Sequence, residues 1–315
     1  MSADPAIDPI EHCIERVRGV YSRWRRDTPV AQMRADWDEL FWSEVVTASC
    51  EPVSAGGVPA QWIVADGADE SRVLLYFHGG GFQVGSLRSH RDLMARLSAA
   101  GNCRVLGVEY RLAPEHRFPS QLHDALAAYR WLLEQGIAAT RLALAGDSAG
   151  AGLGLSVLLA LRDEGIALPA AAVALSAWTD LTASGGSYET CADSDPIHQR
   201  RMILAVARNY LGEQGDAADP LASPLHGDLH GLPPLLLQVG DRETVLDDSR
   251  DFAAKARAAG VEVRLDVAEG MIHVYQQFAD DLPQARAAIA AIGAFLQAHW
   301  PHAAAISPSQ PDTDA

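Results

Sequence analysis

A serine between two glycines is the first feature of the sequence that could carry out chemistry. Ser148 lies in Gly-Asp-Ser-Ala-Gly at 146–150, after a short apolar run at 142–145 and before a helical pattern at 152–161. This order predicts a sharp strand-to-helix turn that exposes the hydroxyl, and the glycines relieve backbone crowding there. The first amides of the helix would face developing negative charge. Ser148 is therefore a candidate nucleophile, and its neighbour Asp147 is expected to brace the turn.

A second motif, His-Gly-Gly-Gly at 78–81, follows a predicted strand at 71–77. Consecutive glycines let backbone N–H groups face a substrate oxygen with no side chain between them. A phosphate-binding loop would continue with Gly-Lys-Ser or Gly-Lys-Thr, whereas Phe-Gln-Val follows here. We therefore expect the amides of Gly79, Gly80 and Ala149 to form an oxyanion hole.

Strand-like and helix-like segments alternate from about residue 44 onward. Apolar and β-branched runs predict strands at 58–65, 71–77, 103–110, 142–145, 170–175, 234–239 and 261–267. Helical periodicity is clearest at 119–135, 148–164, 244–259 and 281–300. This alternation predicts an α/β protein with a mostly parallel sheet and helices on both faces.

Two segments do not follow the alternation. The first fifty or so residues predict helices at 11–26 and 29–40, and the region 180–221 contains a predicted helix at 197–211. We expect residues 1–43 to form a helical cap arm, and residues 44–302 to form the catalytic domain with a cap insertion at about 180–221. Residues 303–315 have little to bury and predict a disordered tail.

Several motifs together resemble the bacterial hormone-sensitive-lipase family of α/β-hydrolase carboxylesterases. Besides the two glycine motifs, the chain has Tyr-Arg-Leu-Ala-Pro-Glu at 110–115 and Asp-Pro-Leu-Ala-Ser-Pro at 219–224, in the family's order. The resemblance implies an α/β-hydrolase fold with an eight-stranded, mostly parallel sheet flanked by helices. It also implies a cap built from the N-terminal arm and an insertion after strand six. The family uses a triad in the order Ser, acid, His, and needs no metal or organic cofactor.

The family order locates the general base in a loop between the last strand and the final helix. Of the 11 histidines, only His273 has this position, within Gly-Met-Ile-His-Val at 270–274. His226 and His230 have a spacing that metal sites use, but the surrounding glycine, proline and leucine indicate a loop without a third ligand. We therefore predict His273 as the base and disfavour a zinc site.

The triad acid is less strongly indicated by the pattern. The family usually has an aspartate at the first position of D-x-L-x-D, and aligning residues 243–247 with this pattern puts Glu243 there and Asp247 at the second acid. Thr244 and Asp247 also form a capping-box pattern, so we expect Asp247 to bind the start of a helix. Glu243 is the predicted acid, while Asp247 and Asp241 remain alternatives.

Composition limits the partners and the compartment. The 41 acidic residues outnumber the 25 basic ones, and the net charge of −16 repels nucleic acid and anionic membranes. No window has about 18 consecutive apolar residues, and the N-terminus lacks a signal-peptide pattern. Four widely spaced cysteines indicate a reducing environment. We expect a cytoplasmic protein that takes a small ester, with a homodimer left open.

These features predict a serine hydrolase that cleaves carboxylic esters of short to medium acyl chain through an acyl-enzyme. A lactone, a carbamate or a deacetylation target fits the same residues. A non-catalytic receptor on this scaffold is disfavoured because such receptors tend to lose the triad histidine, and His273 is present. A dehalogenase generally needs a carboxylate where this chain has Ser148; a peptidase is a further alternative.

Overall fold

A single mixed sheet forms the centre of the protein. The computed structural model describes residues 8–25, 27–42 and 47–301, and in them the sheet has eight strands in the order β1-β2-β4-β3-β5-β6-β7-β8. The strands are β1 (Ala48–Ala55), β2 (Val58–Ala65), β3 (Val73–Phe77), β4 (Arg104–Val108), β5 (Leu142–Asp147), β6 (Ala171–Leu175), β7 (Leu235–Gly240) and β8 (Val263–Ala268). β2 pairs antiparallel with β1 and β4, and the other pairs are parallel. The predicted eight-stranded, mostly parallel sheet is confirmed.

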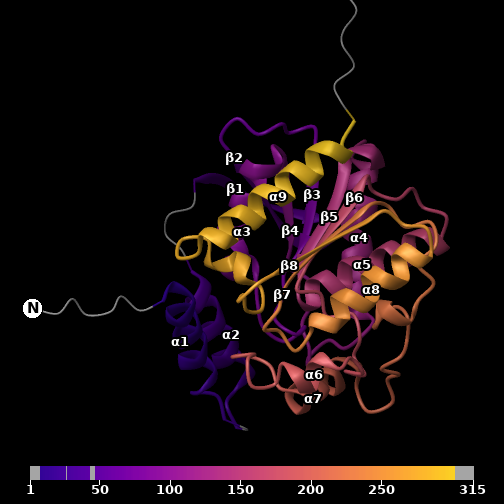
Figure 1. Ribbon diagram of the computed structural model, residues 1–315. Helices are drawn as coiled ribbons and strands as arrows, with labels where there is room; N and C mark the ends of the chain where they lie inside the picture. The colour runs from indigo at the N-terminus through magenta and orange to yellow at the C-terminus, as the bar shows by residue number, and fades with distance from the viewer. Residues whose placement is uncertain (1–7, 26, 43–46, 302–315) are drawn as a thin grey trace, which may run out of the picture.

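Helices cover both faces of the sheet, and each face has its own apolar core. α3 (Leu87–Gly101) and α9 (Pro283–His299) pack together on one face, with α1 (Pro9–Tyr21) extending the same core. α4 (Ser120–Glu134), α5 (Ala149–Asp163) and α8 (Leu246–Ala258) build the core of the other face. Figure 1 shows the yellow α9 beside α3, with α4, α5 and α8 across the strands from them. Every residue of β3, β5, β6 and β7 is consequently buried.

β1 and α3 are elements that the sequence patterns did not predict. β1 is an edge strand whose first seven residues are exposed or half-buried, and it contains Pro52. Proline and polar residues weaken the strand signal and are tolerated at a sheet edge, where one side of the backbone needs no partner. The seven other strands lie close to their predicted ranges.

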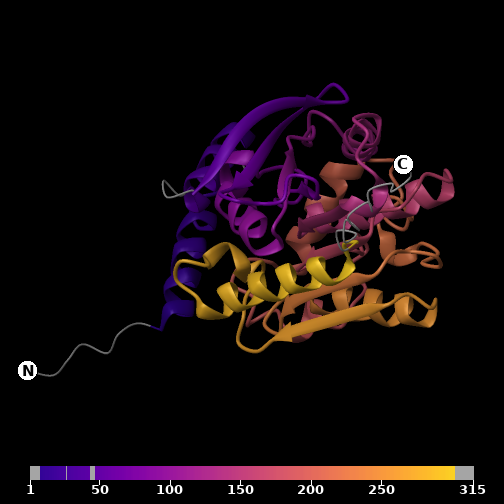
Figure 2. The ribbon, with the colours of Figure 1, turned by 90° about the horizontal axis from the view of Figure 1, so that it is seen from above.

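Local signals in the sequence mark the start of the first N-terminal helix, α1. Asp8 caps α1 by accepting a hydrogen bond from the Ile10 amide, and Pro9 occupies the first turn. α2 (Val30–Phe41) packs on α1 through aromatic contacts, including Tyr21 against Trp37 with ring centroids 5.9 Å apart. In Figure 2 these indigo helices lie along one side of the molecule.

The insertion between β6 and β7 carries α6 (Ser187–Thr190) and α7 (Arg200–Leu211). Figure 1 shows α6 and α7 at the same end of the sheet as α1 and α2, and residues of α2 and α7 line one cavity. The predicted boundary at residues 43 and 44 and the predicted tail at 303–315 lie outside the described residues.

Candidate active site

Ser148 occupies a strained turn between β5 and α5. Its φ of 53° and ψ of −120° lie in a region that residues with a side chain rarely adopt. The turn packs so tightly that a Cβ on Gly150 would lie 2.1 Å from the Phe77 carbonyl oxygen, and one on Gly146 would lie 2.5 Å from the Gly150 oxygen. Glycine is therefore required at both flanks. The arrangement presents the serine side chain where β5 ends.

His273 and Glu243 meet at the same end of the sheet. His273 lies in the loop between β8 and α9, and its Nδ1 is 2.8 Å from Oε2 of Glu243. The other carboxylate oxygen of Glu243, Oε1, accepts hydrogen bonds from the Ser176 hydroxyl and the Gly240 amide. The Glu243 side chain is completely buried. These donors hold the carboxylate so that the proton of the neutral imidazole is kept on Nδ1.

The environment of His273 would suit it to act as a base. Burial acts to lower the pKa of His273, but the hydrogen bond and charge of Glu243, with the charges of Asp195 and Asp147, raise it above the ordinary 6.5. Its Nε2 is buried and has no hydrogen-bond partner within the described residues. Ser148 and His273 line the same cavity. Nε2 is therefore the atom available to take a proton inside it.

The capping-box prediction for Asp247 is wrong. α8 begins at Leu246 without a side-chain cap, because the hydroxyl and amide of Thr244 both donate to Asp195. Asp247 instead accepts a hydrogen bond of 2.8 Å from the Ser187 amide in the insertion. Tertiary contacts thus engage both residues of the local motif.

Asp241 also has another partner. Its Oδ1 accepts a hydrogen bond of 2.8 Å from the Gly270 amide. Among the three carboxylates considered for the triad, Glu243 is the one that bonds to His273.

The expectation that the Gly79 amide faces substrate is wrong. This amide donates to Oδ1 of Asp147 at 2.9 Å, and the same oxygen accepts from the Tyr76 hydroxyl at 2.7 Å. Burial acts to raise the pKa of Asp147, but the charge and hydrogen bond of His90 and the bond from Tyr76 lower it overall. The carboxylate therefore stays ionised, and it holds the glycine loop, residues 79–81, through the Gly79 amide.

Gly80 and Gly81 are the loop glycines that line the cavity with Ser148. Both have positive φ, 112° and 61°, and a Cβ on Gly80 would lie 2.2 Å from the Val84 oxygen. Ala149 opens α5, so its amide has no partner in the preceding turn. Gly80 and Ala149 belong to the predicted set, whereas Gly81 does not. A run of three glycines does not reveal which of them line the cavity.

The cavity around Ser148 encloses about 520 Å³. Its walls come from α1 and α2, the glycine loop, the insertion with α7, and the loop that follows His273. Mostly apolar and aromatic side chains form the walls, among them Tyr21, Trp24, Val30, Met33, Trp37, Phe41, Trp178, Ile197, Met202, Ile203 and Val206. Such a cavity suits an uncharged, largely apolar ligand.

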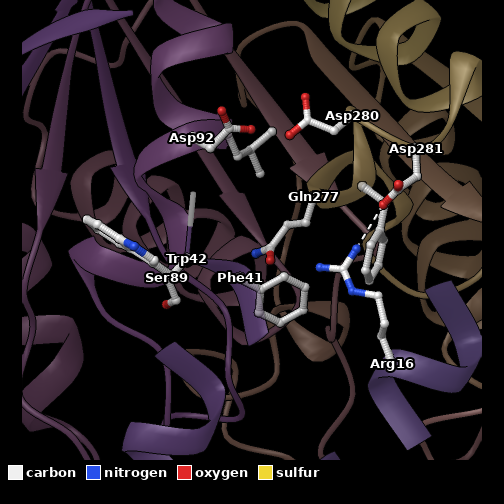
Figure 3. Close-up of a pocket in the computed structure, with 10 residues that line it drawn as sticks. Arg16, Phe41, Trp42, Ser89, Asp92, Gln277, Asp280 and Asp281 are labelled. Carbon is white, nitrogen blue, oxygen red and sulfur yellow. Dashed lines mark hydrogen bonds and ion pairs between the residues drawn. The ribbon is translucent and has the colours of Figure 1, made fainter. Parts of the chain in front are cut away.

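A smaller cavity of about 270 Å³ adjoins the first, and Phe41 and Gln277 line both. Figure 3 shows its wall, where Arg16 of α1 pairs with Asp281 at 2.8 Å. Ser89 also lines it, but its hydroxyl bonds within the first turn of α3. The larger cavity, which contains Ser148 and His273, is therefore the candidate active site.

The two histidines with metal-like spacing face different carboxylates. His226 Nε2 lies 3.0 Å from Asp180, and His230 Nδ1 lies 2.6 Å from Asp228. Over the described ranges, no group of three or more His, Cys, Asp or Glu residues is arranged to hold a metal ion. Among the described helices, none has the length and apolarity needed to cross a membrane.

Comparisons with known proteins agree with this architecture. The profile of the alpha/beta hydrolase fold matches residues 74–277. An esterase of the bacterial hormone-sensitive lipase family superposes with a TM-score of 0.89 at 43% identity, covering 96% of this chain and 100% of that one. This chain belongs to the bacterial hormone-sensitive-lipase family of α/β-hydrolase esterases.

Other members of the family have names that describe an activity. An acetyl-hydrolase of Streptomyces hygroscopicus is 45% identical over 78% of this chain and 81% of its own length. An ethyl acetate hydrolase of Pseudomonas putida is 34% identical over 74% of this chain and 75% of its own length.

Proposed function

We propose that this protein hydrolyses carboxylic esters of short to medium acyl chain, with Ser148, His273 and Glu243 as its catalytic triad. One observation carries the proposal: a serine on a strained strand-to-helix turn shares a cavity with an imidazole whose Nδ1 is held by a buried carboxylate. A serine hydroxyl is a weak nucleophile unless a base removes its proton, and the free Nε2 of His273 is suited to that task.

The reaction proceeds in two acyl transfers. His273 takes the proton of Ser148 while the serine oxygen attacks the ester carbonyl, and the resulting imidazolium returns the proton to the departing alcohol. Water then attacks the acyl-enzyme by the same route and releases the acid. Glu243 keeps the imidazole in the productive tautomer and stabilises its charged form.

The oxyanion that forms on the carbonyl oxygen needs amide donors. We assign this role to Gly80, Gly81 and Ala149 in place of the predicted set. The support is that both glycines line the cavity, that Ala149 opens a helix, and that Asp147 occupies the Gly79 amide. Each such donor typically contributes about 2.7–4 kcal/mol to lowering the barrier.

The cavity and the relatives support small ester substrates. A volume of about 520 Å³ with apolar walls accommodates more than an acetyl group, and two relatives are named acetyl-hydrolase and ethyl acetate hydrolase. We assign the substrate limit to a cap formed by α1, α2 and the insertion with α7, because these elements supply most of the wall.

We place the enzyme in the cytoplasm, because all four cysteines are free and disulfides are rare in that reducing compartment. A homodimer is the assembly we favour. β8 ends the sheet order, and Val267 on it is 41% exposed. Sedimentation velocity distinguishes a dimer from a monomer.

The proposal is tested with p-nitrophenyl butyrate and a fluorophosphonate probe. The wild-type protein should hydrolyse the ester and gain the mass of one phosphonyl group on the peptide that contains Ser148. Ser148→Ala should lose both properties while keeping its circular dichroism spectrum. Ser156→Ala, a change of another buried serine in α5, serves as the control and should retain both. Full activity of Ser148→Ala would refute the assignment.

A further inference from the structure

A second buried histidine, His198, lies against His273 in the wall of the active-site cavity. The two ring centroids are 4.4 Å apart, and the ring planes meet at 83°. The side chain of His198 is 11% exposed, and it lines the same cavity as Ser148. The acyl-transfer mechanism above gives this imidazole no role.

Asp195 fixes the position of His198. Oδ1 of Asp195 accepts hydrogen bonds from the amides of Ile197 and His198, at 2.8 and 2.9 Å. Oδ2 accepts from the amide and hydroxyl of Thr244, at 2.8 and 2.9 Å. Because Thr244 follows Glu243 directly, one buried carboxylate ties the insertion to the loop of the triad acid. The hydrogen bonds of Asp195 therefore fix the position of His198 relative to His273.

The environment of His198 also fixes its charge. Burial and the neighbouring His273 lower the pKa of His198 to about 3, so the ring is neutral at neutral pH. Its Nδ1 is buried and lies 3.8 Å from Oδ2 of Asp195. This distance is too long for a hydrogen bond, but the negative charge of Asp195 favours the tautomer that carries its proton on Nδ1 and its lone pair on Nε2. Because Nδ1 is buried, Nε2 is the polar ring atom that a ligand in the cavity can contact.

The chemistry of ester cleavage indicates which part of a substrate lies beside His198. The acyl carbon is bonded to Ser148, whereas the departing alcohol oxygen must lie within hydrogen-bonding reach of His273 to receive its proton. A ring packed on His273 therefore borders the alcohol part. Because its centroid is 4.4 Å from that of His273, a polar group of the alcohol close to the ester oxygen would lie beside it.

We propose that His198 is a specificity-determining residue of the alcohol subsite, where its Nε2 accepts a hydrogen bond from a hydroxyl group on the departing alcohol. The substrate class that fits is a carboxylic ester of a diol or polyol with one hydroxyl left free near the ester oxygen. This inference rests on the proposed ester hydrolysis. It adds a recognition contact and no chemical step.

The test compares two butyrate esters that differ in one group. 2-Hydroxyethyl butyrate and propyl butyrate have the same acyl chain, and a terminal hydroxyl replaces a methyl group. The ratio of their kcat/KM values is measured by acid release for the wild type, His198→Leu and His198→Gln. Because intrinsic reactivity cancels between variants, a lost neutral hydrogen bond should lower the ratio about three- to tenfold in His198→Leu. His198→Gln retains an acceptor and should recover part of it.

Two controls separate alcohol recognition from other effects. Gln277→Leu changes another polar side chain of the same cavity and should keep the wild-type ratio. The ratio for propyl acetate and propyl butyrate, which differ only in the acyl part, should be the same in the wild type and His198→Leu.

Four outcomes would overturn the assignment. If His198→Leu lowers kcat/KM equally for both butyrates, His198 only supports the position of His273. If the ratio of the two kcat/KM values falls in Gln277→Leu and not in His198→Leu, the hydroxyl group binds to the Gln277 amide. A ratio unaffected by residue 198 rejects the contact while ester hydrolysis stands. A wild-type protein that cleaves neither ester rejects the hydrolysis itself, and the inference with it.

Discussion

Replacing Glu243 with glutamine tests the triad assignment most directly. In the wild type, Oε1 of Glu243 accepts from the Ser176 hydroxyl and the Gly240 amide, and Oε2 faces Nδ1 of His273. A glutamine oxygen keeps its bonds with the two donors, which turns the NH₂ group toward Nδ1. The imidazole then has to accept at Nδ1 and carry its proton on Nε2. In that tautomer His273 has no lone pair available for the proton of Ser148.

The size of the effect follows from this tautomer. In serine proteases, the corresponding change of acid to amide lowers kcat about ten-thousandfold, equivalent to about 5.4 kcal/mol. The Ser176 hydroxyl can rotate and accept from the new amide, which would relieve part of the conflict. We therefore expect Glu243→Gln to lower kcat about a thousandfold to ten-thousandfold, with a small change in KM.

The assay is steady-state hydrolysis of p-nitrophenyl butyrate, combined with thermal denaturation to confirm folding. Asp247→Asn is the matched control, because it makes the same chemical change four residues away. Asp247 bonds to Ser187 in the insertion, so its change should lower the free energy of unfolding by about 1–2 kcal/mol and leave kcat within about threefold. If Asp247→Asn loses orders of magnitude in kcat while Glu243→Gln stays active, the acid has been assigned to the wrong residue.

Three further predictions follow from the same geometry. His273 must be neutral to act as the base, and its pKa is raised above 6.5. The value of kcat/KM should therefore fall with decreasing pH through a midpoint above 6.5. A midpoint below 6.5 would contradict the stated environment of His273. Gly150→Ala puts a Cβ 2.1 Å from the Phe77 oxygen and should lower the free energy of unfolding by at least about 1–3 kcal/mol in denaturant titrations. Gly19→Ala is the control on an open helix surface, and it should raise the free energy of unfolding by about 0.5–1 kcal/mol. Asp147→Ala releases the Gly79 amide and should lower kcat about a hundredfold, because the glycine loop that we assign to the oxyanion would become less ordered. Unchanged kcat in a folded variant would show that the loop keeps its conformation without this carboxylate.

The fold could be predicted from the sequence because its signals are local and repeated. Buried strands such as β5 and β7 are continuous apolar runs, since helices cover both of their faces. The glycines around Ser148 are needed by the turn itself, so the candidate nucleophile is recognisable as a short sequence pattern. The position of His273 followed from the order of elements along the chain. β1 was missed because an edge strand needs only part of its surface buried.

Only the tertiary structure decided how the polar groups are shared among partners. The sequence could not show that Asp147 would take the Gly79 amide, or that Asp195 would take Thr244 away from the helix it was expected to cap. Each of these bonds joins segments far apart in the chain, and a buried donor accepts whichever partner the packing brings near. The sequence thus indicated the candidate nucleophile and the scaffold, whereas long-range packing determined which glycines line the cavity with Ser148 and which carboxylate bonds to His273.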